Sequence, residues 1–410
     1  MSREFDVIVV GAGVVGAALA AGLAAAGVCE PGRVALLADA PAHPVAADTD
    51  WDLRVFALSR ASERLLRFAG AWDLVPSRRL HPYGRMCVWD ASGEAGGRGS
   101  LTFDGADMGE PNLGMIAEGR ALQSACLQAA RTAGVVVIEA ALAAVETGAT
   151  AARVRLGDGR ELRGGLVVAA DGTDSTARAL LGIGTAGHTY LQDAIVAHVR
   201  TALPHQNTAW QRFLPSGPLA FLPLPDGRSS IVWSTARAEA ARLRTLDADA
   251  FAAELDAASG AALGRCEPAT ARAGFPLKLQ YALEYARPRA VLVGDAAHVV
   301  HPLAGQGLNL GLMDCAALIE TLRDAGGPRS FGDLRVLRRY ERWRKSENLV
   351  AAAVLDGFER LFSSTSFVLS RLRSRGLEVV GALPVVKRGF AERALGLAGD
   401  VPRFIRDVPR

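Results

Sequence analysis

The 410-residue chain is poor in the residues that mark several classes of protein. It has five cysteines, and none of them stands in a C-x-x-C pair or at the spacing of zinc ligands. A disulfide framework is therefore not expected, and the pattern predicts a reduced, cytoplasmic protein without a metal site. Aromatic residues make up only 6% of the chain and do not alternate with basic ones, which argues against a nucleic-acid partner.

Long apolar runs are also scarce. Residues 7–28 carry no charge, but Arg3, Glu4 and Asp6 before them are not the basic start of a signal peptide. The glycines within the run explain its apolarity as a buried strand and helix, and no other stretch is long enough to span a bilayer. Half of the residues are hydrophobic, so a sizeable core is expected, in one large domain or in about two or three ordinary ones.

The N-terminal segment indicates a ligand. Residues 6–16 combine a buried strand, a tight turn and a helix start, with Gly11, Gly13 and Gly16 in the turn. This is the G-x-G-x-x-G fingerprint of dinucleotide binding in its required context, where the helix N-terminus faces a pyrophosphate. A second strand ends at Asp39, which is placed to bind the adenosine ribose hydroxyls.

A strand, an acid and a glycine-rich turn occur together again at residues 291–311. Asp295 follows the strand and can accept hydrogen bonds from a polyhydroxyl chain. The glycines further on let a flat ligand approach the backbone at the start of the next helix, whose dipole favours negative charge. A flavin fits this arrangement, with its ribityl chain on Asp295 and its N1/O2 edge against the helix start. The residues predicted to contact it there are Gly305, Gln306, Gly307, Leu308 and Asn309.

Four further residues are candidates for the same site. Asp171 ends another buried strand and begins an acid-glycine turn, which we predict to pack against the pyrophosphate. Arg178, in the same element, either closes a surface ion pair or guides a nicotinamide donor. Arg54 and Arg120 are candidate contacts to phosphate or to the flavin edge, although many arginines are only surface charges.

Two histidines near the flavin motif deserve a separate interpretation. His298 and His301 are three residues apart, but no third ligand accompanies them and the helix starts only near residue 305, so we reject a metal pair. His298 is predicted to be a hydrogen-bonded structural residue of the turn. His301 and Pro302 should lie near the flavin face and are candidates for a role on the substrate side. No Ser-His-Asp or Cys-His arrangement stands out, so hydrolysis is not indicated.

The motifs lie far apart in the chain, so the dinucleotide domain is predicted to be discontinuous. Between them, residues 186–284 combine alternating strands with Pro-rich turns and an Ala-rich helix, which indicates an inserted domain with a mixed or antiparallel sheet. The predicted fold class is α/β, with three parts: a Rossmann-like FAD-binding domain (1–75, 105–185 and 285–345), a substrate domain (76–104 and 186–284) and a C-terminal helical region (346–410).

The three motifs together resemble the class A flavoprotein aromatic monooxygenases, the family with the p-hydroxybenzoate hydroxylase fold. Further segments are similar to the FAD-dependent hydroxylases of ubiquinone biosynthesis, namely residues 52–62, 81–83, 86–90, 217–224, 301–307 and 339–344. Single-ring phenol hydroxylases of this fold usually lack the His-Pro-x-Ala-Gly-Gln-Gly form found at 301–307. One departure is Gly119, where the family commonly has Asn, and it weakens only the local contact there.

The resemblance implies FAD as cofactor, O2 as co-substrate and NAD(P)H or another electron donor as reductant. It implies hydroxylation of the aromatic ring of a polyprenylphenol intermediate through a flavin C4a-hydroperoxide. The flavin then carries the chemistry, and the protein supplies anion stabilisation, positioning and exclusion of water. Two alternatives stay open, a hydroxylase of a small soluble phenol and a non-catalytic flavoprotein subunit of a quinone-biosynthesis complex.

Charge is distributed unevenly along the chain. Residues 335–410 hold 16 Lys and Arg against 8 Asp and Glu, a net charge of +8, which leaves −5 on the first 334 residues. A solvated helical surface explains this excess, but a basic amphipathic segment also fits weak attachment to an anionic membrane or to a quinone-biosynthesis complex. A polyprenyl substrate favours such attachment. The expected location is therefore the cytoplasm, with peripheral association at the inner face of the membrane.

Overall fold

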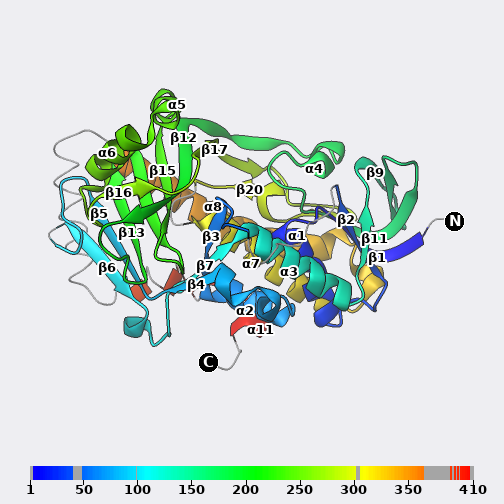
Figure 1. The fold of residues 1–410 in the computed structure, drawn as a ribbon. Coiled ribbons are helices and arrows are strands. Elements are labelled where there is room, and N and C mark those ends of the chain that lie inside the picture. Colours follow the sequence, from blue (N-terminus) through cyan, green and yellow to red (C-terminus); the bar gives the residue numbers. More distant parts are fainter. Residues whose placement is uncertain are drawn as a thin grey trace.

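The structure is a computed structural model that describes residues 3–39, 49–97, 99–301, 305–363, 388–389, 392–393, 395–396 and 398–406. The side chains of residues 3, 354–356 and 358–363 are not described. Two halves lie side by side, one built on a largely parallel sheet with helices and one on a largely antiparallel sheet (Figure 1). The α-helices are α1 (Val14–Ala25), α2 (Arg60–Phe68), α3 (Gly119–Thr132), α4 (Thr176–Leu180), α5 (Arg237–Thr245), α6 (Ala248–Ser259), α7 (Gln306–Arg323), α8 (Leu334–Ser363) and α11 (Arg403–Arg406).

An eight-stranded sheet forms the centre of the first half, in the order β18-β19-β11-β1-β2-β8, with β10 and β9 continuing from β11. Strands β19, β11, β1, β2 and β8 run parallel. β19, β2, most of β1 and the second half of β11 are buried on both faces, which explains their nearly continuous apolar sequences. Helices α1, α3 and α7 pack together against this sheet (Figure 1). The strands are β1 (Arg3–Val10), β2 (Val34–Ala38), β8 (Val136–Glu139), β9 (Leu142–Thr147), β10 (Ala152–Leu156), β11 (Glu161–Ala169), β18 (Ala286–Arg287) and β19 (Ala290–Leu292).

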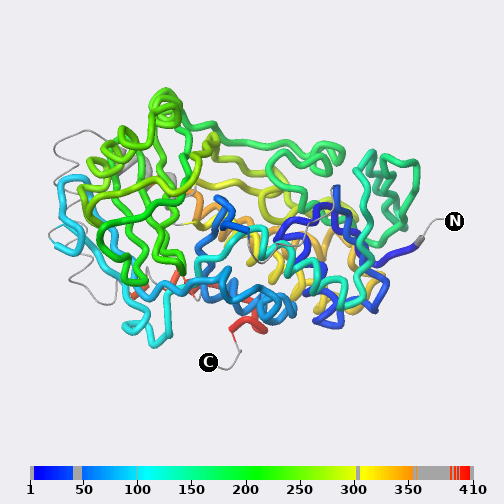
Figure 2. Tube along the Cα trace, viewed as in Figure 1, coloured from blue at the N-terminus to red at the C-terminus, as the bar shows by residue number. Residues whose placement is uncertain are grey.

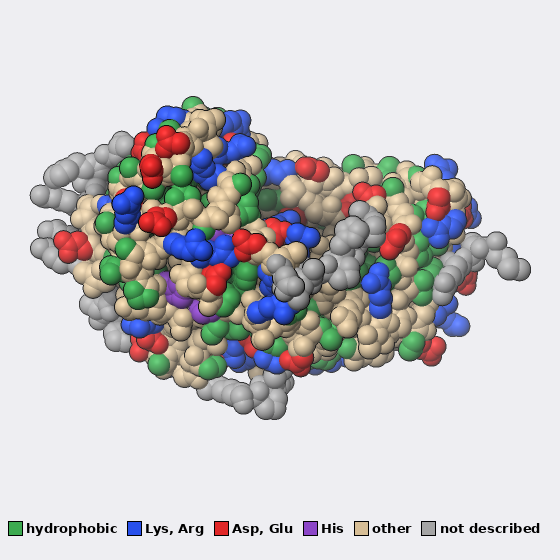
Figure 3. All heavy atoms as spheres, in the orientation of Figure 1, with side chains coloured by type: hydrophobic (Ala, Val, Ile, Leu, Met, Phe, Trp, Pro, Cys, Tyr) green, Lys and Arg blue, Asp and Glu red, His purple; other side chains and the backbone are tan. Residues whose placement is uncertain are grey.

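A nine-stranded sheet forms the second half, in the order β20-β17-β12-β15-β14-β13-β5-β6, with β16 attached to β12. Helices α5 and α6 lie on its outer side, and acidic and basic side chains are interspersed over this end of the molecule (Figures 1 and 3). The strands are β5 (Arg85–Asp90), β6 (Ser100–Asp104), β12 (Thr185–Thr201), β13 (Thr208–Leu214), β14 (Gly217–Pro223), β15 (Ser229–Ala236), β16 (Cys266–Pro268), β17 (Ala273–Ala282) and β20 (His298–Val299). Segments 76–104 and 186–284 thus contribute strands to one sheet, and the exact domain boundaries stay a prediction.

A small third sheet stands between the two halves. It consists of β3 (Val55–Ser59), β7 (Gly114–Glu118) and β4 (Leu80–Tyr83), paired antiparallel in that order. The tube view shows that the blue N-terminal segment and the yellow segment near residue 300 lie in the same half although the sequence separates them widely (Figure 2). The thiol of Cys315 in α7 lies 3.3 Å from the Val15 carbonyl of α1, so the two segments are in direct contact.

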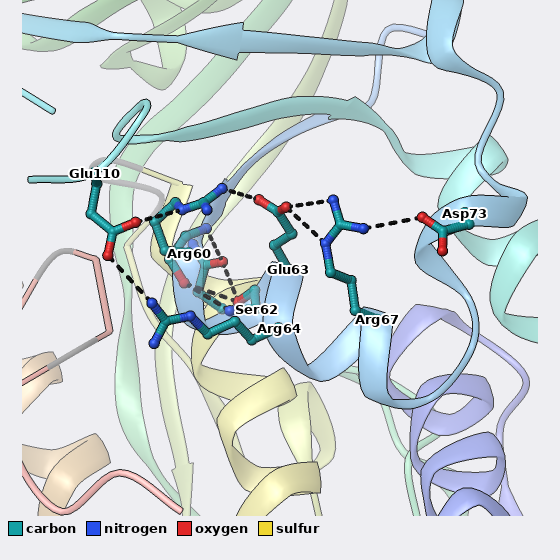
Figure 4. Close-up of polar contacts among 9 residues, drawn as sticks. Arg60, Ser62, Glu63, Arg64, Arg67, Asp73 and Glu110 are labelled. Atoms are coloured by element: carbon teal, nitrogen blue, oxygen red, sulfur yellow. Dashed lines mark hydrogen bonds and ion pairs between the residues drawn. The ribbon is translucent and has the colours of Figure 1, made fainter. Parts of the chain in front are cut away.

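Helix α2 connects several parts of the chain through ion pairs (Figure 4). Arg60 and Arg64 both pair with the buried Glu110, at 3.2 and 3.3 Å, which fixes the loop before β7. Arg64 also donates a hydrogen bond of 3.4 Å to the carbonyl of Ile405. Ile405, near the C-terminus, is therefore held by the same helix that follows β3.

The C-terminal residues pack against the first half. Ile405 is completely buried, and the rings of Phe404 and Phe68 have centroids 4.5 Å apart. Arg403 pairs with Glu320 of α7 at 2.7 Å. Residues 398–406 thus cap α2 and α7, whereas residues 364–387 of the predicted C-terminal helical region (346–410) lie outside the described residues. Within the part of the chain that the structure describes, no helix is both long enough and apolar enough to cross a membrane.

Candidate active site

Four predicted site residues follow four neighbouring strands of the eight-stranded sheet. In the order β19-β11-β1-β2, the residues just beyond the strand ends are Asp295, Asp171, Gly11 and Asp39. The strands run parallel, so these residues stand at the same carboxyl edge. In open α/β sheets a ligand binds along this edge, and one extended dinucleotide can reach all four turns. The motifs that the sequence separates are therefore brought together.

Glycine occupies the three positions of the first turn for different structural reasons. Gly11 has a φ of +105°, and a Cβ there would lie 2.5 Å from the Ala170 carbonyl oxygen, while a Cβ on Gly16 would lie 1.9 Å from the Gly11 oxygen. These two positions require glycine for the packing of the protein itself. Gly13 has an ordinary φ of −69°, and a Cβ there would meet nothing within 4 Å. The open space over Gly13, at the N-terminus of α1, fits a pyrophosphate.

A contact from α3 fixes this turn, and the sequence did not reveal it. The side-chain amide of Gln123 donates a hydrogen bond of 2.8 Å to the carbonyl of Ala12, between the first two glycines. Gln123 stands three residues after Arg120, and residues at that spacing share one side of a helix. That spacing is the one signal in the sequence that could have pointed to Gln123.

Arg54 and Arg120 meet around one acid. The Asp52 carboxylate accepts the backbone N–H of Arg54 at 2.8 Å and lies 3.6 Å from Nε of Arg120. The Gly119 N–H donates to the Arg54 carbonyl at 2.9 Å, and the Arg54 guanidinium stands 5.3 Å from the centre of the Phe56 ring. The structure thus brings the two arginines together at the starts of β3 and α3, and their contact with a flavin stays a prediction.

Asp171 shapes its own turn. Its carboxylate accepts hydrogen bonds from the Ser175 hydroxyl and, at 2.8 Å, from the Ala177 N–H. It therefore binds the N-terminus of α4, and Gly172 after it has a φ of +85°. Because both carboxylate oxygens of Asp171 accept these hydrogen bonds, the backbone of the turn is the part that can face a pyrophosphate.

Arg178 links the two acid turns of the site. It is buried, and its guanidinium donates to the carbonyls of Ala296 at 2.9 Å and Thr173 at 3.0 Å. The Thr173 hydroxyl in turn donates to the Asp295 carboxylate at 3.3 Å. Arg178 is therefore not a surface ion pair, as one of our interpretations proposed. It ties the turn after β11 to the turn after β19.

The start of α7 has the geometry expected for a flavin edge. Gly305 is its N-cap, with a φ of +63° that favours glycine. The backbone N–H groups of Gly307 and Leu308, in the first turn, have no acceptor within the helix. A Cβ on Gly307 would meet nothing within 4 Å. Polar N–H groups beside open space fit the N1/O2 edge of a flavin, which carries negative charge when reduced.

The side chain of Asn309 is engaged in hydrogen bonds within the protein. Its side-chain oxygen accepts the Ser59 N–H at 2.9 Å and the Ser62 hydroxyl at 2.7 Å, and its amide donates to the Ala57 carbonyl at 2.9 Å. The buried side chain thus fixes the start of α7 against β3 and α2. Of the predicted contacts at this helix start, Asn309 can offer only its backbone.

The two histidines occupy different places. Nε2 of His298 lies 2.6 Å from the Asp314 carboxylate, which confirms the prediction that His298 is a structural residue. His301 is buried, and its ring stands edge-on to Tyr190 of β12 with centroids 5.1 Å apart. Pro302 lies outside the described residues. Across the described ranges, no three His, Cys, Asp or Glu side chains are grouped so that they could hold a metal ion.

A parallel sheet with glycine and acid turns at its carboxyl edge, beside a large antiparallel sheet, is the fold of the flavoprotein aromatic-ring monooxygenases. The p-nitrophenol 4-monooxygenase PnpA from Pseudomonas putida DLL-E4 superimposes with a TM-score of 0.76 at 19% identity, over 98% of this chain and 100% of that one. PqsL from Pseudomonas aeruginosa, a probable FAD-dependent monooxygenase, gives a TM-score of 0.71 at 24% identity, over 92% and 100%. These likenesses confirm the predicted α/β fold of the p-hydroxybenzoate hydroxylase type.

Sequence comparison identifies the family. The FAD binding domain family model matches residues 111–351. The 3-demethoxyubiquinol 3-hydroxylase of Escherichia coli K12 is 36% identical over 97% of this chain and 100% of its own length. The ubiquinone hydroxylase UbiL of Rhodospirillum rubrum is 36% identical over 98% and 93%, and the human mitochondrial ubiquinone biosynthesis monooxygenase COQ6 is 33% identical over 93% and 91%. The chain belongs to this family of FAD-dependent hydroxylases and is an enzyme that uses FAD and O2.

Proposed function

We propose that this enzyme hydroxylates the aromatic ring of a polyprenylphenol intermediate in ubiquinone biosynthesis. The observation that carries the proposal is the end-to-end match to the 3-demethoxyubiquinol 3-hydroxylase of Escherichia coli, whose whole length this chain covers at 36% identity. Two further relatives that act in ubiquinone biosynthesis by name, from a second bacterium and from human mitochondria, match over more than nine-tenths of the chain.

FAD, once reduced by NAD(P)H or another donor, supplies the activation of O2. The residues of the chain hold and orient it. The turn at Gly13 and the N-terminus of α1 bind the pyrophosphate, Asp39 binds the ribose hydroxyls, and Asp295 binds the ribityl chain. The first turn of α7 stabilises negative charge at the N1/O2 edge without any reorganisation during the reaction.

The substrate side of the site is assigned to the contact between the two sheets. His301, from the loop before α7, and Tyr190, from β12, form an aromatic layer that is almost fully buried. Behind Tyr190, Ala194 and Leu277 complete a small apolar cluster of β12 and β17. A dry aromatic layer of this kind excludes water from a reactive flavin and receives a phenol ring.

The proposal is tested in a strain that lacks the gene for this protein. Mass spectrometry of its quinone intermediates should reveal a polyprenylphenol that lacks one ring hydroxyl, and the wild-type gene should remove this intermediate. An Asp295→Ala gene should not, because FAD affinity falls about ten- to a hundredfold when a charge-assisted hydrogen bond is lost. An unchanged quinone profile in the deletion strain would contradict the proposal.

We also propose that the enzyme associates peripherally with anionic membrane through the outer face of α8. Arg335, Arg338 and Arg342 are exposed on this face, and within the described residues they form no ion pair. Leu349 and Val350, at 40% and 45% exposure, continue the face toward the C-terminus. Basic residues followed by exposed apolar ones fit lipid headgroups and the acyl boundary.

Vesicle sedimentation tests the membrane proposal. The wild-type protein should bind vesicles that contain anionic lipid, and added salt should weaken the binding. Changing Arg335, Arg338 and Arg342 together to Gln should abolish it. A matched control changes the exposed Arg131, Arg153 and Arg155 to Gln, since this alters the net charge equally but leaves α8 intact. Equal loss in both triple variants would show that only net charge matters, and the docking face would be wrong.

A further inference from the structure

Asp314 of α7 is a fully buried carboxylate whose two oxygens bond in different directions. Its Oδ2 accepts the Gly294 N–H at 3.0 Å and lies 2.6 Å from Nε2 of His298. Its Oδ1 accepts Nε–H of Arg344 at 2.8 Å and Nδ2–H of Asn348 at 3.0 Å. Four donors occupy the lone-pair sites of an ionised carboxylate, so Asp314 has no capacity left for a ligand.

The Oδ2 partners are the two ends of the turn that carries Asp295. Gly294 opens the turn, and His298 begins β20, which leaves it. Gly294 has a φ of +60°, and a Cβ there would lie 3.1 Å from the Val15 side chain of α1. Because both ends of this short turn meet one oxygen, the direction of the Asp295 side chain depends on where Asp314 stands.

The Oδ1 partners come from α8. Arg344 and Asn348 are one helical turn apart, both are buried, and Nη2 of Arg344 donates to the Asn348 side chain at 2.9 Å. A single carboxylate therefore connects a C-terminal helix to the turn after β19. The Tyr340 hydroxyl of α8 adds a hydrogen bond of 2.9 Å to the Leu292 carbonyl, at the end of β19 just before this turn.

Asp314 is charged in this buried setting. Burial alone raises the pKa of a carboxyl group, but the charges and hydrogen bonds of His298 and Arg344 bring the pKa of Asp314 down to about 2. Removing one partner of a buried ion pair is costly because the other charge stays buried without compensation. The positions of Asp314 and Arg344 thus depend on each other.

We infer that Asp314 is a positioning residue for the flavin: it sets the Gly294–His298 turn, and α8 holds it through Arg344 and Asn348. The inference rests on the proposed assignment of Asp295 to the ribityl chain. Its consequence is that α8 contributes to FAD affinity through a carboxylate that does not touch FAD.

A second buried acid of α7 provides the control. Glu320 stands on the same helix and accepts the Arg403 N–H and its guanidinium, both at 2.7 Å. It binds Arg403 near the C-terminus, and among the described residues its side chain makes no hydrogen bond or ion pair to the flavin turn. Glu320→Gln therefore removes a buried charge from α7 without disturbing the position of Asp295.

FAD titration of the apoproteins tests the inference. Asp314→Asn should raise the dissociation constant of FAD about tenfold or more, because an amide cannot accept from four donors. The visible absorption bands of the flavin that still binds should shift, since its surroundings have changed. Glu320→Gln should leave both the dissociation constant and the spectrum unchanged.

A pair of His298 variants keeps the test decisive if Asp314→Asn does not fold. Gln can donate an amide N–H to Oδ2, so His298→Gln should bind FAD nearly as the wild type does, whereas His298→Ala should bind it more weakly. Wild-type affinity in folded Asp314→Asn, or in His298→Ala, would overturn the positioning role. If Asp295→Ala loses FAD while these variants keep it, only this inference fails; if Asp295→Ala also keeps FAD, the flavin assignment fails with it.

Discussion

The side chain of Gln123 holds the carbonyl of Ala12 at 2.8 Å, so helix α3 fixes the glycine turn at the end of β1. This contact crosses from one layer of the domain to another and orients the backbone on which a pyrophosphate would rest. A turn held only by its own glycines would be less ordered before the cofactor binds, and ordering it would reduce the affinity.

Gln123→Ala should therefore weaken FAD binding about fivefold, which corresponds to the loss of one neutral hydrogen bond of about 1 kcal/mol. Gln128→Ala is the matched control, because Gln128 is exposed on the same helix. Fluorescence titration of the apoproteins measures both dissociation constants. Equal affinities for the two variants would mean that α3 does not order the turn.

Two glycines of the same turn should respond oppositely to substitution. Gly13→Val should fold normally and lose FAD, because its side chain enters the open space assigned to the pyrophosphate. Gly16→Ala should fail to fold or melt much earlier, since its Cβ would stand 1.9 Å from the Gly11 oxygen. Circular dichroism separates folding from binding. A folded Gly13→Val protein that retains FAD would refute the placement of the pyrophosphate.

The charge of Asp314 should make the stability of the folded protein depend on pH in the acidic range. Its pKa is about 2 in the folded protein against 3.8 ordinarily, so the unfolded chain binds more protons between these values. The Asp314 charge contributes about 2 kcal/mol to the free energy of unfolding. This contribution is complete above about pH 5 and is lost as pH falls toward 2. The difference in melting temperature between wild type and Asp314→Asn should therefore narrow from pH 5 to pH 3. A constant difference would show that Asp314 does not titrate with folding.

The chain end should matter for stability more than for chemistry. Ile405 is completely buried against the first half, and Ile→Ala changes in a core cost about 2–5 kcal/mol. Ile405→Ala should thus lower the melting temperature and leave FAD affinity near the wild-type value. Arg388→Ala, at an exposed ion pair, should change neither. If Ile405→Ala loses FAD at low temperature, the chain end takes part in the cofactor site.

The end of the chain also affects how membrane binding can be tested. A truncation near Ser363 removes residues 398–406 together with the basic segment before them, and these residues contact α2 and α7. Loss of activity in such a truncation would therefore reflect unfolding as readily as loss of membrane contact. Point changes on the exposed face of α8 avoid this problem.

Much of the site could be predicted because each motif is local. A strand, an acid or glycine, and a helix start within one short segment identify the turns at Gly11, Asp39, Asp171 and Asp295, and parallel pairing then places them at one edge. The helix start near residue 305 was predicted from its glycines in the same way. These features depend on the backbone conformation of a few consecutive residues.

The supporting contacts could not be predicted, since they join residues that only the fold brings together. Gln123 donates a hydrogen bond to the Ala12 carbonyl in another layer, and Arg178 donates one to the Ala296 carbonyl beyond β19. Asp314 looks like an ordinary polar position in a helix until α8 packs beside it. The sequence predicts Asn309 at the flavin because it follows the glycine turn, whereas the structure shows its side chain bonded to β3 and α2.

Incorporation of labelled oxygen tests the central claim most directly. The purified holoenzyme is supplied with NAD(P)H, ¹⁸O2 and a demethoxyubiquinol that carries a short prenyl tail, and the products are analysed by mass spectrometry. The wild type should form a ring-hydroxylated product that contains one ¹⁸O atom, and Asp295→Ala should not. Bound FAD and oxidation of the donor without labelled product from any prenylated phenol, or with label only in a small soluble phenol, would contradict this claim.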